Sequence, residues 1–554
     1  MVLVVWFAGA LVFFRAQWRS GWNLMMGNDG DPRLVVYLNE HWFQVFHGQA
    51  SWLNPGFFYP VKGLLGWSDT FFLYQVFYGP LRLLGADPFL AMQLTIVLLS
   101  LVGFASFFAL VRLGFGSGRV VALALALAFT FSNTLWLHAG SFQDNGVWLV
   151  PLVALCGLAA WRAAGEGRRL RAGLLGFACG GLAIMFLYTT FYVGYFSFLA
   201  ALILLIVALV VGRARFVRAA VGGVATRWRA VVAAVAGFGI GLWPFILTYL
   251  SAQRSTPSNN YAIAVAYAGR IPDVINIGSG NVLWSSLIHS VIPRVNLQSY
   301  ELTYAPTPAL WLAALGGGLL CALWLWTGRA TDPAAARTAV VLAITTLIMA
   351  GVGLHSRPVT MWAAIHHLPG AKALRAIDRA QIVTGYLAFL TVAAAATEVF
   401  QRLSWSRARH YESGRAGRRW LLYPSMALLC LVVVEQWNTA DTSMVSRRTQ
   451  NALLASVRPA PSGCRTFFVV DSQNSRMPFF EYQIDAMLIS QKLRLPTING
   501  YTAHNPPAWN LERPGDPAYL DSVQSWLTQN RLSGGVCKLD LAGMNWSRAG
   551  RSTT

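Results

Sequence analysis

The sequence predicts a polytopic α-helical membrane protein with a small soluble α/β domain at its C-terminal end. Composition is the first observation: of 554 residues, 55% are hydrophobic and 12% are charged, and the mean hydropathy is +0.48. Soluble domains rarely reach these values. The second observation is a series of long apolar runs, and the third is a change to mixed polar sequence after Trp437. We therefore predict a transmembrane domain over residues 1–437 and an α/β domain over residues 438–554.

The apolar runs define the predicted membrane-spanning helices, because each approaches the length needed to cross about 30 Å of hydrocarbon. About eleven spans are expected, near residues 1–14, 90–111, 119–137, 146–161, 172–189, 191–212, 230–250, 307–327, 336–354, 380–400 and 420–436. Long connections remain at residues 15–89, 251–306 and 355–379. The first run is short, so it is tilted, incomplete or preceded by further sequence. We expect it to stay as an anchor.

Arginine-rich connections alternate along the chain and set the predicted orientation. They are RLGFGSGR, RAAGEGRRLR, residues 213–229, GRATDPAAAR and QRLSWSRARHYESGRAGRR. Cytoplasmic loops are enriched in Lys and Arg, so the N-terminus is predicted inside and the C-terminal domain outside. Arg15 and Arg19, on the outer side of the first span, oppose this assignment. The same loops account for the net charge of +21. No nucleic-acid partner is expected, since no basic stretch carries interleaved aromatic residues.

The C-terminal domain shows alternating strand and helix patterns. RTFFVV and GVCKLDL predict strands, whereas FFEYQIDAMLISQKL and AYLDSVQSWLTQN predict helices. Cys464 and Cys537 flank this domain, and an oxidising compartment favours a disulfide between them. The other four cysteines lie in predicted spans, and no metal-binding spacing is present.

Charged residues gather in GNDGDPRLVVYLNEHWFQVFH, residues 27–47, directly after the first span. Asp31 before Pro32 is a typical helix start, with the carboxylate as the cap and proline at the first helical position. A carboxylate beside a membrane cavity is also an available base. We predict Asp31 as the catalytic base, with Asp29 and Glu40 as supporting acids. The alternative is an amphipathic interfacial helix with solvated charges.

Three further stretches hold candidate substrate-binding residues in predicted outer segments. Asp69 lies in GWSDTFF, His138 and Asp144 lie in the short acidic turn LHAGSFQDNGVW, and Tyr501 and His504 lie in NGYTAHNPPAW. The last stretch has the polar and aromatic character of a surface that recognises sugars. The alternatives are a simple turn for the acidic stretch and an ordinary domain loop for the other.

Cations cluster in HSRPVTMWAAIHHLPGAKALRAIDRAQ, on the predicted outer side, against the usual distribution. The candidates for binding a lipid phosphate are Arg357, Lys372, Arg375 and Arg379. Arginine in particular binds phosphate oxygens in a bidentate way. General binding to anionic lipid headgroups is the alternative. The adjacent His366 and His367 point to different faces of a helix, which disfavours a metal site.

Together these stretches resemble the membrane-embedded glycosyltransferases with the GT-C fold, in particular the bacterial branch that includes YfhO-like and mannosyltransferase-like proteins. The matching sequences are GDPRLVVYLNEHW, FFYPVKGLLGWSDTFF, HAGSFQDN, YELTYAPTPALW with Glu301, LPGAKALRAIDRAQ and NGYTAHNPPAW. The resemblance implies an active-site aspartate in the first outer loop and a polyprenyl-phosphate sugar donor. It also implies a multi-pass protein of the bacterial cytoplasmic membrane that serves the cell envelope. No clear DE pair or DxD stands in the usual place of this family, and the acidic run here is Asp29-Gly30-Asp31, so the choice of aspartate and any divalent metal stay open.

The predicted function is therefore transfer of a hexose-type sugar from a polyprenyl-phosphate donor to an extracytoplasmic glycolipid, polysaccharide or protein acceptor. Phosphate as a leaving group needs cations more than a general acid, and the acceptor hydroxyl needs one carboxylate base. One alternative is a transporter or flippase of lipid-linked sugars, which would place ionisable residues near the middle of its spans. Another is a non-catalytic membrane assembly protein, because fold does not determine function.

Overall fold

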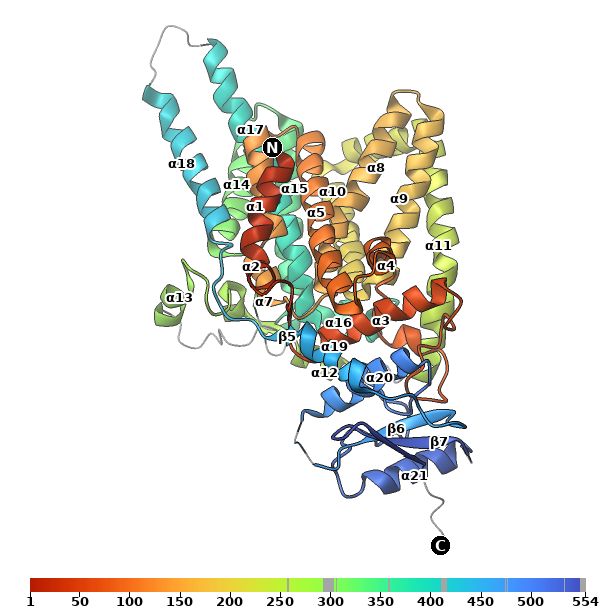
Figure 1. The fold of residues 1–554 in the computed structure, drawn as a ribbon. Coiled ribbons are helices and arrows are strands. Elements are labelled where there is room, and N and C mark those ends of the chain that lie inside the picture. Colours follow the sequence, from red (N-terminus) through yellow and green to blue (C-terminus); the bar gives the residue numbers. More distant parts are fainter. Residues whose placement is uncertain are drawn as a thin grey trace.

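The computed structural model describes residues 1–256, 259–291, 303–304, 306–356, 359–409, 416–473, 475, 477–532 and 534–548. Long helices form one part of the molecule, and a small sheet with its helices forms the opposite end, next to the C-terminus (Figure 1). This arrangement matches the predicted fold class.

Within the described residues, nine stretches are long and apolar enough to cross a membrane. They are built from α5 (Pro88–Gly114), α6 (Arg119–Thr130) with α7 (Asn133–Leu137), α8 (Val150–Gly165) with the preceding 3-10 helix (Asp144–Leu149), α9 (Arg169–Thr189), α10 (Phe191–Thr226), α11 (Trp228–Ser255), α14 (Pro308–Trp326), α15 (Pro333–Val352) and α17 (Ala380–Arg409). Each lies where the apolar runs predict a span.

The first and last predicted spans correspond to shorter apolar helices. They are α1 (Val2–Phe13) and α18 (Ala416–Val434), of which Tyr423–Val434 is the apolar part. The Trp6 indole N–H donates to Ser100 Oγ of α5 at 3.1 Å, so α1 packs on the helical bundle. The predicted total of about eleven spans thus divides into nine full-length helices and two short ones within the described residues.

Small residues allow the closest helix packing in the bundle. A Cβ on Gly180 of α9 or Gly237 of α11 would collide with backbone atoms of the other helix. Without a hydrophobic driving force between helices in lipid, close backbone approach at small residues is a main source of association. These two glycines therefore join α9 and α11 as a unit.

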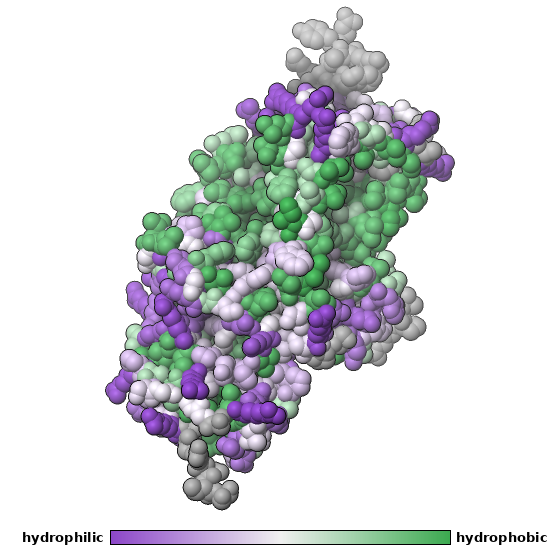
Figure 2. Space-filling model, turned by 90° about the vertical axis from the view of Figure 1, so that its right-hand side faces the viewer, coloured by the Kyte–Doolittle hydropathy of each residue, from purple (hydrophilic) through white to green (hydrophobic). Residues whose placement is uncertain are grey.

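Hydrophobic side chains form a band across the helical part, with hydrophilic residues at both ends (Figure 2). The α8–α9 connection and the neighbouring ends of α17 and α18 lie at the end that also holds the N-terminus (Figure 1). Contacts of Ser117 with Thr397, and of Thr331 with Glu398, bring two more arginine-rich connections to this end. These four arginine-rich connections thus share one end of the molecule, opposite the small sheet of the C-terminal segment.

The connections that are predicted on the outer side fold together at the other end of the bundle. Their elements are α2 (Arg15–Arg19), β1 (Leu24–Met26), α3 (Asp31–Phe46), α4 (Gln75–Leu83), α12 (Tyr261–Ala266), β2 (Gly269–Arg270), α13 (Ser285–Val291), β3 (Leu354–Ser356), β4 (Val359–Thr360) and α16 (Trp362–Ile365). Strand β2 pairs in parallel with β3, and β3 pairs antiparallel with β4. Two long connections of the bundle therefore meet in one small sheet.

The C-terminal segment contains β5 (Met444–Ser446), α19 (Arg447–Ser456), β6 (Thr466–Val470), α20 (Phe479–Leu493), α21 (Tyr519–Gln529), β7 (Val536–Asp540) and β8 (Asn545–Arg548). The two predicted strands and two predicted helices are confirmed, and β5, α19 and β8 are additions. Strand β7 pairs in parallel with β6 and antiparallel with β8. The expected disulfide joins Cys464 to Cys537, whose Cα atoms are 5.7 Å apart.

The C-terminal segment is tied closely to the first outer connection. Strand β5 pairs antiparallel with β1. The Phe58 N–H donates to the Asn499 carbonyl at 2.9 Å, and the Tyr59 N–H donates to the Thr497 carbonyl at 2.9 Å. Helix α20 packs on α3 (Figure 1). The boundary predicted at residue 437 stays a prediction, but residues on its two sides form common structure.

Candidate active site

Asp31 is the first residue of α3, but it does not cap the helix. Gly30 occupies the cap position without a side-chain capping bond, and Pro32 lies in the first turn. The Gly30 N–H instead donates to the Asn28 side chain at 3.0 Å. The predicted capping role of Asp31 is therefore wrong by one residue. At the first helical position its carboxylate still benefits from the positive end of the helix dipole.

The carboxylate of Asp31 faces residues from two other outer segments. Burial raises its pKa from the ordinary value, while Arg379, Arg375 and a hydrogen bond from Gln143 oppose that rise. Asp144 contributes a smaller upward shift, because like charges disfavour ionisation. The structure thus brings together Asp31, the acidic turn and the cationic loop, which the sequence places far apart.

A buried histidine and a buried carboxylate form a hydrogen-bonded pair within this cluster. His138 Nδ1 lies 2.9 Å from Asp144 Oδ2, and His138 Nε2 lies 3.2 Å from Thr303 Oγ1. A carboxylate accepts hydrogen bonds, so Nδ1 carries a proton and Nε2 can accept from the threonine hydroxyl. Asp144 Oδ1 lies 4.0 Å from Arg379 Nη1. Asp144 therefore orients the histidine on one side and balances the arginine on the other.

Asp69 approaches the same cluster from the loop before α4. Its carboxylate accepts from the N–H of Phe191, at the start of α10. Burial raises the pKa of Asp69 to about 7, with Asp144 and Asp31 adding to the rise, whereas the Phe191 N–H and Arg379 lower it. Asp69 is thus electrostatically coupled to Asp31 and Asp144, and Arg379 is the cation that all three share.

The cationic side of the cluster centres on Tyr192. Arg379 Cζ lies 5.2 Å from the centroid of the Tyr192 ring, and the tyrosine hydroxyl accepts from the Arg375 N–H at 2.9 Å. The Arg379 side chain is 15% exposed, whereas Arg375 and Lys372 are exposed. Tyr192 was missed by sequence reasoning, because an uncharged residue inside an apolar run carries no distinguishing signal.

The C-terminal segment reaches the cluster through the loop after Asn499. Burial and then the charge of Arg375 lower the pKa of His504, so the histidine lies within electrostatic range of that arginine. Tyr501 packs with its ring centroid 6.4 Å from that of Phe479 and 6.1 Å from that of Phe480. His504 is therefore within electrostatic range of the cationic loop, whereas Tyr501 packs on the start of α20.

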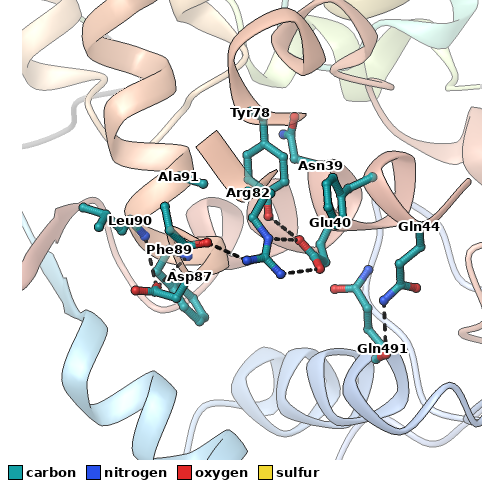
Figure 3. Close-up of polar contacts among 12 residues, drawn as sticks. Asn39, Glu40, Gln44, Tyr78, Arg82, Asp87, Phe89, Leu90, Ala91 and Gln491 are labelled. Carbon is teal, nitrogen blue, oxygen red and sulfur yellow. Dashed lines mark hydrogen bonds and ion pairs between the residues drawn. The ribbon is translucent and has the colours of Figure 1, made fainter. Parts of the chain in front are cut away.

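Glu40 lies apart from Asp31, in an ion pair with Arg82 (Figure 3). Arg82 Nε and Nη2 donate to the two carboxylate oxygens at 2.7 and 2.9 Å, and the Tyr78 hydroxyl donates at 2.8 Å. Glu40 lies nine positions after Asp31 in α3, about 13.5 Å along the helix axis. The geometry does not support the predicted role of Glu40 as an acid beside Asp31, because its carboxylate already holds α4 against α3.

Asp29 also points away from the cluster. The charged groups that it influences are those of Glu481 and Asp485 on α20, and its carbonyl accepts from Arg33. The two aspartates of the acidic run thus face different parts of the molecule. Of the remaining candidates, Glu301 and Arg357 lie outside the described residues.

The site also bears on a divalent metal. The described part of the chain has no group of three or more His, Cys, Asp or Glu residues that could hold a metal ion. Asp144 Oδ1 is buried and has no hydrogen-bond partner among the described residues, but it faces a guanidinium. These described residues do not form a metal centre by themselves.

The comparison with solved structures identifies the fold of the chain, which is the GT-C fold. It is similar to the oligosaccharyltransferase of Archaeoglobus fulgidus tethered to an acceptor peptide, with a TM-score of 0.50 and 12% identity over 97% of this chain and 68% of the other. No family model matches the sequence, and no curated protein matches it.

Two other solved structures match with lower TM-scores. The arabinofuranosyltransferase AftD from Mycobacteria has a TM-score of 0.48 and 13% identity, over 91% of this chain and 32% of that one. ArnT from Cupriavidus metallidurans, bound to undecaprenyl phosphate, has a TM-score of 0.40 and 13% identity, over 90% of this chain and 84% of that one.

Proposed function

We propose that the protein is a membrane glycosyltransferase that moves a sugar from a polyprenyl-phosphate donor to an extracytoplasmic acceptor. One observation carries the proposal: a carboxylate whose pKa is raised by burial, Asp31, lies within electrostatic range of two arginines of another connection. This pairs a base with a phosphate-binding group at one end of a helical membrane bundle. The GT-C fold supports the same reaction class.

The reaction needs one proton acceptor and one site for the leaving phosphate. Asp31 accepts the proton of an acceptor hydroxyl as its oxygen forms a bond to the anomeric carbon of the donor sugar. The bond between that carbon and the phosphate oxygen breaks, and the electron pair leaves with the lipid phosphate. Arg375 and Arg379 stabilise the charge that develops there, because guanidinium groups bind phosphate in a bidentate way. A raised pKa makes Asp31 a better base than an ordinary carboxylate.

The surrounding groups keep this pair in position. Asp144 faces Arg379 and also binds His138, so the arginine is held by a carboxylate that is itself anchored. Asp69 accepts from the start of α10, next to Tyr192. We infer that these residues hold the phosphate-binding side chains and that His504 borders the donor on the C-terminal side.

The position of the ionisable residues disfavours a transporter. Within the nine spans, the Asp and Glu residues are Asp144, Asp378 and Glu398, and all lie within five residues of an end of their span. A transporter is expected to place such groups near the bilayer midplane. We therefore favour transfer at the outer end of the bundle. A hexose donor and a location in a bacterial cytoplasmic membrane are part of this proposal.

The test is loss of donor when purified protein is incubated with radiolabelled polyprenyl-phosphate sugars and a membrane extract. Asp31→Asn should cut turnover by roughly a hundredfold or more, the scale of general-base catalysis. Asparagine keeps the size and helix-start preference of the side chain but cannot accept the proton. Near-normal turnover of a folded Asp31→Asn protein would refute the assignment of Asp31, and absence of turnover with every donor would refute the function.

A further inference from the structure

We propose that Arg33 and Asp485 are positioning residues, through which α20 of the C-terminal segment holds the turn that carries Asp31. The inference rests on the proposed function, because it takes Asp31 as the catalytic base. Its consequence is that the C-terminal segment is a working part of the active site rather than an appended domain.

Arg33 bridges the turn and the C-terminal segment. One end of its guanidinium donates to the carbonyl of Asp29 at 3.2 Å, and the other forms an ion pair with Asp485 of α20. The side chains of Arg33 and Asp485 are only 2% and 9% exposed. Since Asp29 and Arg33 flank Asp31 in the chain, this contact closes the turn around the catalytic carboxylate.

Two further contacts place α20 along α3. The ring of Phe480 lies against Gly30, the residue before Asp31. A Cβ added to that glycine would be 3.6 Å from the ring. Farther along, the Gln491 side chain donates to the Tyr37 carbonyl at 2.9 Å. The ion pair lies between these contacts in the sequence of α20. It therefore sets the register of the two helices at the level of the turn.

A buried ion pair is suited to positioning two helices, because its charged groups are paired in only one arrangement of those helices. Removal of one partner leaves an uncompensated charge, so the helices cannot slide past each other without cost. A displacement of about 1 Å at a catalytic group can lower turnover by about a hundredfold. The pair thus couples the position of α20 to the position of Asp31.

The experiment uses Asp485→Asn in the full-length protein, with Arg447→Gln as the matched control. Arg447 also joins the C-terminal segment to the membrane domain, through an ion pair with Asp87 at 2.8 Å, but it does not contact the turn. Asp485→Asn should lower kcat roughly ten- to hundredfold while the KM for donor stays unchanged. Arg447→Gln should leave both constants near those of the parent protein.

The pH profile provides a second readout that a purely structural role would not move. The charged groups that act on Asp31 are Asp69, Asp144, Arg375 and Arg379. Those around the ion pair are Asp29 and Glu481. All of these groups remain in the Asp485→Asn protein. A loosened turn admits water to Asp31, so its pKa falls and the acidic limb of kcat moves to lower pH. Asp485→Glu, which keeps the charge, should restore part of kcat and return the limb toward its original place.

The outcomes separate the two proposals. If Asp485→Asn and Arg447→Gln have the same kcat and the same acidic limb, the positioning role is wrong even though Asp31 remains the base. If Asp31→Asn is active, the proposed function itself fails. Should Asp485→Asn not fold, Phe480→Ala removes the contact with Gly30 without leaving a charge, and an unchanged kcat there would overturn the positioning by α20.

Discussion

At the scale of single residues, Asp31 and Asp29 illustrate how one turn serves two purposes. Asp31 faces the arginines of another loop, whereas Asp29 faces the acids of α20. Only two positions separate them, but Gly30 and the helix start at Asp31 turn the chain between them. The acidic run is therefore not a pair of equivalent carboxylates, and one of them is directed to the cationic loop.

The arginines beside Asp31 should differ in their effect on donor binding. Arg379→Gln should raise the KM for donor about ten- to hundredfold, because a charge-assisted hydrogen bond is lost at a buried site. Arg375→Gln should have a smaller effect and Lys372→Gln the smallest, since both side chains are exposed. Donor kinetics of the purified variants check this order. Arg448→Gln, an exposed cation of α19, serves as the control. Equal KM values in all four variants would return the cluster to general headgroup binding.

At the scale of elements, α3 distributes its polar residues among several partners. Arg33 binds α20, and the His41 ring lies 3.0 Å from the Trp52 carbonyl. Burial lowers the pKa of His41 to about 4, so this histidine is neutral at physiological pH. Helical spacing places these residues on neighbouring faces of α3, but each binds a different segment. The charged face of α3 is therefore a set of anchors with a single catalytic candidate at its start.

Glu40 provides the sharpest test of this view. Glu40→Gln should lower the free energy of unfolding by about 3 kcal/mol, at the low end for a broken buried ion pair. The folded variant should keep near-normal turnover, because Glu40 does not reach Asp31. Thermal unfolding in detergent and turnover per folded protein measure the two effects. A large loss of turnover at unchanged stability would instead support the acid role predicted from the sequence.

At the scale of the whole molecule, the disulfide is linked to the membrane topology, because it is expected to form only if the C-terminal segment lies in an oxidising compartment. Cys464 and Cys537 should resist thiol labelling until the protein is reduced, as expected for a segment in an oxidising compartment. The bond closes a separation of 73 residues, and its removal by Cys464→Ser with Cys537→Ser should cost about 2–4 kcal/mol. Two reactive thiols in the unreduced protein would contradict the bond.

The orientation in the membrane is tested independently of activity. Because the arginine-rich connections share one end of the molecule and the C-terminus lies at the other (Figure 1), reporters at Gly165 and after Thr554 should be in opposite compartments, with Gly165 inside. Matching compartments would contradict this orientation.

Arg15 does not oppose the predicted orientation strongly, since its guanidinium stacks 3.8 Å from the Trp136 ring and donates to the Asn438 carbonyl. That arginine therefore has a structural role at the end of the bundle that holds the C-terminal segment.

The sequence by itself determined the features that depend on local pattern. Apolar runs located the spans, alternation located β6 and β7, and amphipathic spacing located α20 and α21, because each property is written into adjacent residues. It also singled out Asp31, Asp144 and Arg379, since charge beside a membrane is costly and therefore informative.

Only the tertiary structure decided which of these residues meet. The partners of Arg33 and Glu40, and the place of Tyr192, depend on contacts between segments distant in the chain. Local pattern cannot specify such contacts, because a charged side chain on a helix can pair with any segment that folds against it. Packing of α20 and α4 on α3 made that choice. It left Asp31 facing the arginines while Glu40 became an anchor.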